Sequence, residues 1–375
     1  MVQFHKLKVA KINRETKDAV SIQFEIPEEL KSTFRYQPGQ YLTVQVVQHD
    51  VKHRRAYSVC SSPAMGDPLT IGVKRVEDGV VSTYLNDHLH AGEMLEFYPP
   101  MGKFTIALDE SFRRNFIMVA GGSGITPIIS LVKSILTEEP QSRVWLFYGN
   151  RNEHSIMFKS QLEELEKRFD NFSLTHIVDM PQESWSGLTG QINHDMLREL
   201  LKQCTDMDLT REAEFFICGP TGMMEQVNAT LREMHVPKEK IHIEYFTSPT
   251  PLADEIGEPE KTTSKAAPAE ATSGLYDEEF PSDGPVNQVK VILNNETTII
   301  QVDEDESILE AAMRQDLDPP YACQMGICTT CRARCKAGEV FMDEREGLTD
   351  QEVEEGFILT CQSHPKTPGV VVEYE

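Results

Sequence analysis

The residues best suited to chemistry lie in one short stretch, PYACQMGICTTCRARC at 320–335, which holds four of the chain's eight cysteines. Three of them follow the spacing C-x4-C-x2-C, and a fourth candidate ligand lies further on in FILTCQS. The four are Cys323, Cys328, Cys331 and Cys361. This is the plant-type ligand set for a [2Fe–2S] cluster, which transfers one electron at a time. Gly326 and its small neighbours allow the backbone to curl around such a cluster and direct N–H groups at its sulfides.

Two other interpretations of these cysteines remain open at this point. Structural zinc usually binds two CxxC knuckles, whereas this stretch has one CxxC and a further cysteine five residues before it. Chance burial is the second alternative, because a free cysteine packs as a small apolar residue. We expect that role for the cysteines outside the pattern, Cys335, Cys60 and Cys204.

A second group of candidate residues lies in RAYS at 55–58. An arginine can clamp a phosphate, a tyrosine can stack on a flat ring, and a serine can bond a ring nitrogen. Further on, GVVST at 79–83 opens a predicted helix, whose first N–H groups and hydroxyls could hold a pyrophosphate. Taken alone, the first motif also fits an exposed strand end and the second an ordinary helix cap.

A third group suits a dinucleotide. VAGGSGITP at 119–127 reads as a strand, a glycine turn and a helix N-terminus, where the backbone can approach a pyrophosphate closely. CGPTGMM at 218–224 follows a predicted parallel strand, and the carboxyl ends of such strands are where these sheets bind ligands. The first motif lacks the full GxGxxG fingerprint, and the second also fits a buried cysteine before a turn.

The elements that must position these residues fall into three domains. Residues 1–107 show short alternating strands and predict an antiparallel β-barrel. Residues 108–246 alternate strands with helices, which predicts an α/β domain with a doubly wound parallel sheet. Its helices are expected at about 125–137, 155–169, 193–203 and 221–235.

The remaining chain divides in two. Residues 247–286 are rich in Pro, Ala, Ser, Thr and acidic residues without an apolar face, which predicts a flexible linker. Residues 287–375 predict an α+β, ferredoxin-like β-grasp domain: a hairpin from VKVIL and TTIIQV, a helix at 306–315, and a closing strand, GVVVEY. The cysteine loop lies within this domain.

Composition narrows the function further. The net charge of −24 argues against a nucleic-acid binder, which needs a basic face. The N-terminus is polar and no apolar run reaches about twenty residues, so neither a signal peptide nor a membrane span is expected and the chain is expected to be cytoplasmic. Residues 287–375 carry seven Lys and Arg against eighteen Asp and Glu, a net charge of −11.

The order of the motifs is more specific than any one of them. RxYS, GxxS, GGxGITP, CGP and then the four cysteines resemble the ferredoxin–NADP⁺ reductase superfamily with a plant-type ferredoxin domain appended. The resemblance implies FAD, NADPH or NADH, and a [2Fe–2S] cluster. The residues implied to hold FAD are Arg55, Tyr57, Ser58, Gly79, Ser82, Thr83 and Phe246. Those implied to hold the nicotinamide nucleotide are Gly121, Gly122, Gly124, Thr126, Cys218 and Gly219.

Within these sets the resemblance implies particular roles. Tyr57 packs on the isoalloxazine, Ser58 lies near its N5, and Cys218 lies beside the nicotinamide, so these three align hydride transfer. Glu244 and Phe246 match a Glu-x-Phe ending whose aromatic ring covers the flavin. Plant reductases have a tyrosine in place of that phenylalanine, which leaves its stacking open.

Partner and nucleotide are also expected. Within the superfamily the chain most resembles the reductases that serve the di-iron oxygenases of phenylacetyl-CoA epoxidation. Reductases of ketosteroid hydroxylases and of the hybrid-cluster protein are similar alternatives, and a non-catalytic iron–sulfur redox sensor is an alternative of another class. Arg151 follows the second strand of the predicted sheet, where it could accept a 2′-phosphate, and Ser155 could add a hydrogen bond. This favours NADPH, with Glu153 as the counter-indication.

Overall fold

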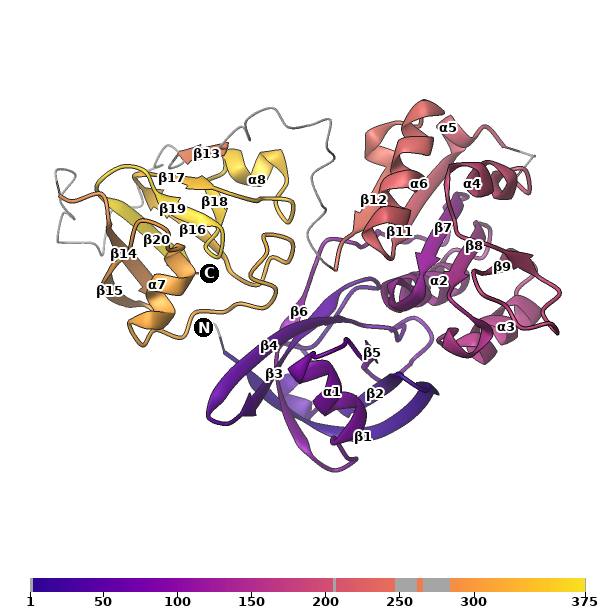
Figure 1. Ribbon diagram of the computed structural model, residues 1–375, viewed down its shortest axis with the longest axis horizontal. Coiled ribbons are helices and arrows are strands. Elements are labelled where there is room, and N and C mark those ends of the chain that lie inside the picture. The colour runs from indigo at the N-terminus through magenta and orange to yellow at the C-terminus, as the bar shows by residue number, and fades with distance from the viewer. Residues whose placement is uncertain (1–2, 205–206, 247–261, 266–283, 375) are drawn as a thin grey trace. The chain divides into compact units, whose positions relative to one another are not determined.

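The computed structural model describes residues 3–204, 207–246, 262–265 and 284–374. The chain divides into two compact units, His5–Phe246 and Met1–Phe4 with Thr247–Glu375 (Figure 1). Each unit has its own apolar cores. No helix in the described ranges is long and apolar enough to span a bilayer.

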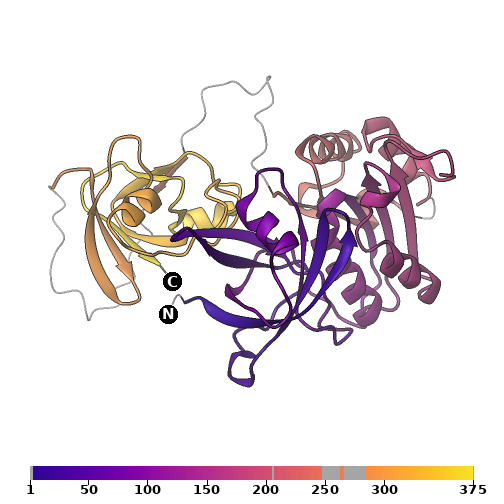
Figure 2. The same cartoon turned by 60° about the horizontal axis from the view of Figure 1, so that its bottom comes forward.

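The first lobe of the unit His5–Phe246 is an antiparallel barrel (Figure 2). Its sheet has the order β4-β3-β6-β1-β2-β5, and a bridge between Val59 and Ile71 links the two ends. Leu42, Val44 and Val46 on β3 all enter the barrel core, because every second side chain of a strand faces the same side. The elements are β1 His5–Thr16, β2 Ala19–Glu25, η1 Glu28–Leu30, β3 Tyr41–Gln48, β4 Val51–Ser58, β5 Thr70–Lys74, α1 Val80–Asp87 and β6 Met94–Met101. The predicted barrel is confirmed.

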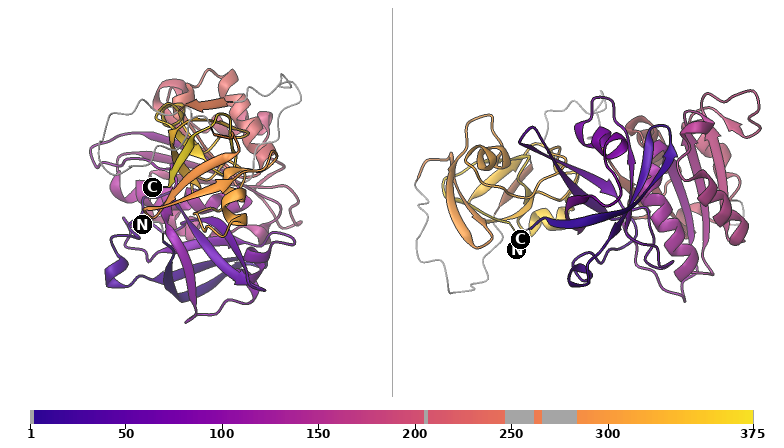
Figure 3. Two further views of the ribbon diagram at one scale, coloured as in Figure 1. Left: turned by 90° about the vertical axis from the view of Figure 1, so that its left-hand side faces the viewer. Right: turned by 90° about the horizontal axis from the view of Figure 1, so that it is seen from below.

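The second lobe is a parallel sheet in the order β10-β9-β8-β7-β11-β12. Its strands are β7 Asn115–Gly121, β8 Arg143–Asn150, β9 Phe172–Val178, β10 Leu188–Thr189, β11 Ala213–Cys218 and β12 Ile241–Glu244. Its helices are η2 Gly122–Gly124, α2 Ile125–Glu138, η3 Glu153–Ser155, α3 Lys159–Arg168, α4 His194–Leu201, α5 Leu209–Glu212, α6 Thr221–Glu233 and η4 Lys238–Lys240. Helices α2 and α3 pack on one face of the sheet, and α4 and α6 on the other (Figure 3). This is the predicted doubly wound domain.

One helix begins later than expected. The sequence predicts a helix over 155–169, whereas α3 begins at Lys159. Phe158 stands before it with a φ of 56°, in the left-handed region that a right-handed helix cannot include. Residues Glu153–Ser155 form instead the separate short turn η3.

The barrel and the parallel sheet are joined by buried contacts through α2. The Ser130 hydroxyl donates to the Ser61 carbonyl at 2.6 Å, and Lys133 forms an ion pair with Asp67 at 3.0 Å. Phe104, from the end of the barrel segment, enters the core between α2 and the sheet. The relative position of the two lobes is therefore set by specific polar pairs as well as by apolar burial.

The unit that contains the cysteines has a five-stranded sheet in the order β15-β14-β20-β16-β18 and a three-stranded sheet in the order β13-β17-β19. The elements are β13 Thr262–Lys265, β14 Gln288–Leu293, β15 Glu296–Gln301, α7 Ile308–Arg314, β16 Arg332–Ala337, β17 Glu339–Met342, α8 Asp350–Glu354, β18 Phe357–Leu359, β19 Ser363–Pro365 and β20 Val370–Tyr374. The predicted hairpin, helix and closing strand are all present.

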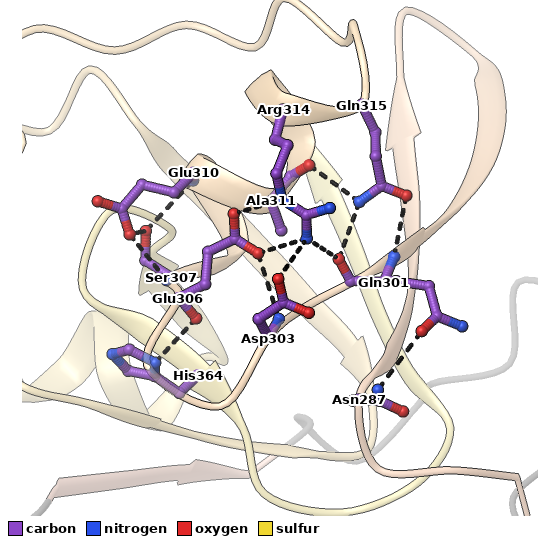
Figure 4. Close-up of polar contacts among 10 residues, drawn as sticks. All are labelled: Asn287, Gln301, Asp303, Glu306, Ser307, Glu310, Ala311, Arg314, Gln315 and His364. Carbon is purple, nitrogen blue, oxygen red and sulfur yellow. Dashed lines mark hydrogen bonds and ion pairs between the residues drawn. The ribbon is translucent and has the colours of Figure 1, made fainter.

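Polar contacts hold α7 against this sheet (Figure 4). Ser307 and Glu310 form a reciprocal cap at its start, in which each side chain accepts the backbone N–H of the other, at 3.2 and 2.9 Å. Arg314 at its end donates to Glu306 at 2.6 Å. His364 on β19 bonds the Glu306 carbonyl at 3.0 Å, which ties the start of the helix to the segment that follows Cys361.

The expected linker, 247–286, is interrupted. Residues 262–265 form β13, which pairs antiparallel with β17. β17 lies between β13 and β19, so residues 262–265 complete this small sheet as one of its edge strands. Threonine favours strands, and the composition of the stretch as a whole hid this local preference. Residues 247–261 and 266–283 lie outside the described residues.

A tight contact between the lobes generates a prediction. A Cβ built on Gly72 of β5 would lie 2.4 Å from Cγ2 of Thr126 at the start of α2. Thr126 is buried and β-branched, so it has little freedom to move aside. We expect Gly72→Ala to lower the free energy of unfolding by about 1–3 kcal/mol, measured by denaturant titration.

A matched control is Gly222→Ala. A Cβ there meets nothing within 4 Å, and Gly222 lies in the first turn of α6. We expect this substitution to leave stability unchanged or to raise it slightly. Equal destabilisation by both substitutions would contradict the tight contact between Gly72 and Thr126.

Candidate functional site

Two glycine-containing turns meet at the point where the strand order of the parallel sheet reverses. β7 and β11 are neighbours, with Ala120 opposite Cys218, although most of the sheet lies between them in sequence. A Cβ on Gly124 would lie 2.0 Å from the Cys218 carbonyl oxygen, and one on Gly121 would lie 2.5 Å from Pro220 Cδ. Only glycine permits this approach. The turns form an edge of bare backbone at the place where such sheets bind nucleotides.

Gly122 and Gly219 complete this edge. Gly122 has a φ of 52°, which favours glycine, and its carbonyl accepts a hydrogen bond from Tyr148 at 3.0 Å. A Cβ on Gly219 would lie 2.9 Å from the backbone of Gly121. The structure therefore brings the four predicted glycines together.

Thr126, the fifth residue predicted at this turn, stays a predicted nucleotide contact, and the structure shows that it also bonds within the turn. Its side chain is buried, and its hydroxyl donates to the Ser123 carbonyl at 3.0 Å. The residue braces the turn and contacts the barrel lobe.

A lysine that the sequence reasoning missed lies beside this turn. Nζ of Lys74, at the end of β5, is 3.9 Å from a Cβ position built on Gly122, and also 3.9 Å from the Asp18 carboxylate. An ammonium group here would attract the phosphates of a dinucleotide. The sequence shows only a lysine at the end of the barrel strand LTIGVK. The fold is needed to show that this strand ends beside the other lobe.

Cys218 and Glu244 stand opposite each other on β11 and β12. Burial raises the pKa of the Cys218 thiol, and the nearby Glu244 raises it further. Glu244 is half-buried, and loss of solvent around its carboxyl raises its pKa to about 8. Both groups therefore carry their protons at neutral pH and can act as uncharged hydrogen-bond donors.

The flavin candidates lie on β4, at the edge of its sheet. Arg55 is exposed, and its Nη1 donates to the carbonyl of Arg54 at 2.7 Å. Tyr57 packs its ring against the barrel core, and burial raises the pKa of its phenol. Ser58 is buried on the opposite face of the strand. Arg55 and Tyr57 thus share one face, as stacking and phosphate binding by a single ligand require.

The segment 79–83 contributes backbone more than hydroxyl groups. Gly79 precedes α1 without a side-chain cap. The Ser82 hydroxyl accepts the N–H of Val76 at 3.0 Å and donates to the Gly79 carbonyl at 3.3 Å, so its bonds are used within the turn. Thr83 is half-buried. Phe246, 39% exposed, ends the unit.

The residues after β8 include those predicted to contact the adenosine ribose. Arg151 is exposed, and within the described ranges its side chain forms no hydrogen bond or ion pair. Glu153 accepts the N–H of Gln182 at 2.8 Å, and backbone hydrogen bonds lower the pKa of its carboxyl. Ser155 does not begin a long helix as expected. Its hydroxyl accepts the N–H of Asn152 and donates to the Asn152 carbonyl, which closes the short turn η3.

The four cysteine sulfurs form two pairs, and they fit a two-iron cluster. Cys328 N–H donates to Sγ of Cys323 at 3.3 Å, and Cys323 N–H donates to Sγ of Cys328 at 3.4 Å. The sulfurs of Cys331 and Cys361 lie 3.3 Å apart. Each pair can thus supply one iron atom with its two protein ligands. Gly326 has a φ of 73°, and a Cβ there would collide with Glu344 at 2.8 Å, so the loop requires glycine.

The surroundings of the four thiols shift their pKa values in opposite directions within each pair. Sharing of a proton with Cys328, helped by backbone N–H donors, lowers the pKa of Cys323 to about 6. The hydrogen bond from Cys331 likewise lowers the pKa of Cys361, while the pKa values of Cys328 and Cys331 rise. In each pair one thiol therefore ionises more readily than the other, and metal ligation requires the thiolate. Cys335 is buried and donates to the Ala337 carbonyl, outside this set.

Three family models match the chain: an oxidoreductase FAD-binding domain at residues 6–106, an oxidoreductase NAD-binding domain at 118–229, and a 2Fe-2S iron-sulfur cluster binding domain at 291–366. Phthalate dioxygenase reductase, described as modular in electron transfer from pyridine nucleotides to [2Fe-2S], has a similar fold. The match has a TM-score of 0.57 and 22% identity, and covers 99% of this chain and 98% of that one.

Curated relatives match over the full length. A component of 1,2-phenylacetyl-CoA epoxidase from Escherichia coli is 33% identical, over 100% of this chain and 99% of its own. The ferredoxin reductase component of 3-ketosteroid-9-alpha-monooxygenase from Rhodococcus rhodochrous is 31% identical, over 98% and 96%. The glycine betaine monooxygenase reductase subunit of Pseudomonas aeruginosa is 32% identical, over 99% and 95%.

Fold, glycine edge and paired thiols define the class as an oxidoreductase with flavin, nicotinamide and [2Fe–2S] domains in one chain. The chain belongs to the ferredoxin–NADP⁺ reductase superfamily, among the electron-transfer reductases of oxygenase systems that carry a ferredoxin domain.

The paired thiols generate a prediction. Cys331→Ser should abolish the iron content and the cluster's visible absorption, because it removes one of the two ligands of one iron. Flavin content and flavin reduction by nicotinamide should persist, since the cysteines belong to a unit with its own core. Iron analysis and flavin absorbance measure both.

Cys335→Ser is the matched control. It removes a buried cysteine of the same unit that lies outside the pairs. It should keep the iron. Loss of flavin from the Cys331 variant, or loss of iron from both variants, would contradict the assignment.

Proposed function

We propose that this chain takes electrons from NADPH and delivers them singly to the di-iron oxygenase of a phenylacetyl-CoA epoxidase, in phenylacetate catabolism in the cytoplasm. The observation that supports it most is the co-existence in one chain of the glycine edge at β7 and β11, the flavin strand β4 and the paired cysteines. Full-length similarity to the Escherichia coli epoxidase component supports the choice of oxygenase. A ketosteroid or glycine betaine monooxygenase is the alternative partner, from the relatives at similar identity.

When bound, the cofactors supply hydride transfer from nicotinamide to flavin and one-electron transfer through the cluster. The chain's residues position and insulate them. Tyr57 offers an aromatic face and Arg55 a free set of N–H donors for the flavin and its phosphates. Cys218 and Glu244, both protonated, close the nicotinamide side with uncharged groups. The two cysteine pairs hold the cluster.

The proposed preference for NADPH rests on Arg151. Its side chain is exposed immediately after β8, the strand whose end meets the adenosine ribose in this kind of sheet. An arginine suits a 2′-phosphate because its N–H groups can bind two oxygens at once. Glu153 is the opposing group, and one of its oxygens is already engaged by the backbone of Gln182.

Arg151→Ala should raise KM for NADPH tenfold or more, about 1.4 kcal/mol, and change KM for NADH little. Steady-state kinetics with ferricyanide as acceptor measure this without a partner. Arg143→Ala is the control: it removes an exposed arginine at the opposite end of the same strand and should affect neither nucleotide. Equal effects of Arg151→Ala on both nucleotides would refute the preference.

The proposed mode of partner recognition is electrostatic. Residues 287–375 carry a net charge of −11. Exposed acids such as Asp343 and Asp350 belong to the segment beside the cysteine loop, where Gly347 N–H bonds the Gly326 carbonyl at 2.8 Å. A basic face on the oxygenase would be drawn to this side. Such attraction raises the rate of encounter more than the affinity, and salt screens it.

With the oxygenase present, turnover should therefore fall as ionic strength rises, while NADPH oxidation by ferricyanide stays nearly constant. Deletion of 287–375 should abolish oxygenation and leave the ferricyanide activity. Oxygenation by the truncated chain would show that electrons leave by another route. Turnover independent of salt would refute the electrostatic docking and leave the route intact.

A further inference from the structure

Tyr374 is a buried tyrosine whose hydroxyl faces the ligand end of the cysteine-bearing unit. It lies on β20, opposite Ala333 of β16, and is 5% exposed. Its Oη donates to Oγ1 of Thr360 at 2.9 Å. Burial raises the pKa of this phenol, so it keeps its proton. A buried hydroxyl that donates to a single partner indicates a specific hydrogen bond rather than simple packing.

Thr360 connects both members of one cysteine pair. It directly precedes Cys361 in the chain and is fully buried. Its Oγ1 donates to the carbonyl of Cys331 at 3.0 Å, and its N–H donates to the same carbonyl at 3.3 Å. Two donors from one residue thus hold the peptide after Cys331, while the backbone links that residue to Cys361. The sulfurs of these cysteines lie 3.3 Å apart.

The direction of the chain of hydrogen bonds follows from its chemistry. A threonine hydroxyl has one proton, and here it is committed to the Cys331 carbonyl, so the oxygen can only accept from Tyr374. Without the phenol, this hydroxyl would lose the partner that fixes its rotation. Both O–H dipoles point their positive ends toward Cys331. Aligned dipoles reinforce each other in a buried site, and with a cluster bound they would favour the additional negative charge of its reduced form.

We propose that Tyr374 is a positioning residue for the iron–sulfur centre, which acts through Thr360 to hold Cys331 and Cys361 in register and to raise the reduction potential. The role concerns the chain's own ligand set and is independent of which oxygenase accepts the electrons. Within the described residues, the hydroxyl of Tyr374 donates to Thr360 and to neither sulfur. Its effect passes through the Thr360 hydroxyl and the Cys331 carbonyl.

The experiment uses the full-length, cluster-loaded protein. Tyr374→Phe keeps the ring in the core and removes only the hydroxyl. It should retain iron yet lower the midpoint potential by about 30 mV, equivalent to a threefold lower ratio of reduced to oxidised cluster at fixed potential. The g values of the reduced cluster in electron paramagnetic resonance should change, and bleaching by a chelator should quicken about fivefold, as expected for one buried hydrogen bond.

Three further variants separate this role from general destabilisation. Thr360→Val should lower the midpoint potential by more than Tyr374→Phe does. Thr360→Ser keeps the hydroxyl and should leave the potential close to that of the unaltered protein. The double variant Tyr374→Phe/Thr360→Val should match Thr360→Val alone, because the phenol acts through that hydroxyl. Thr367→Val is the control, since it removes a threonine hydroxyl that accepts the N–H of Glu339 in the same unit, at 2.8 Å, and it should change nothing in the cluster.

An unchanged potential and unchanged g values in both Tyr374→Phe and Thr360→Val would overturn the proposal. Strictly additive effects in the double variant would also overturn it, since they would show that the two hydroxyls act independently. A shift of equal size in Thr367→Val would assign the effect to general loosening of the unit and refute the specific chain.

Discussion

The carbonyl of Cys218 and the α-carbon of Gly124 stand closer than any side chain would allow, and the catalytic arrangement of the larger unit depends on that contact. It brings the turn after β7 against the turn after β11 and leaves a continuous edge of backbone. On the other side, Gly72 of the barrel lobe accepts Thr126 at the first turn of α2. The short segment 121–126 is therefore packed against residues of both lobes. Close packing therefore fixes the position of this segment relative to the barrel lobe.

A different constraint governs the smaller unit. Four thiols lie in an otherwise apolar core, where a free charge is costly. They share protons in pairs, and backbone N–H groups stabilise Cys323 in its charged form. The fold thus lowers the free-energy cost of the negative charge that iron ligation requires. The loop itself can adopt this conformation because Gly326 has no side chain to collide with Glu344.

Much of this could be predicted from the sequence, where local chemistry and periodicity were strong. The cysteine spacing implied the cluster, and alternating strands and helices implied the parallel sheet. Features that depend on distant segments were missed. Lys74 ends an ordinary barrel strand, and it becomes a candidate phosphate contact only because Gly122 of the other lobe lies beside it. Thr126 and Ser82 stay predicted ligand contacts, and the structure adds that their hydroxyls bond within their own turns. The late start of α3 follows from the backbone of Phe158, which composition does not reveal.

The strand β13 changes how far the cluster unit can travel. Since residues 262–265 pair with β17, the covalent path between the two units runs only from 246 to 262. A fully extended chain of that length spans at most about 55 Å, compared with about 140 Å for the whole stretch from 246 to 286. Pairing of β13 with β17 therefore shortens the covalent tether to less than half of the length expected from the composition of the linker. The range of positions open to the cysteine-bearing unit shrinks with it.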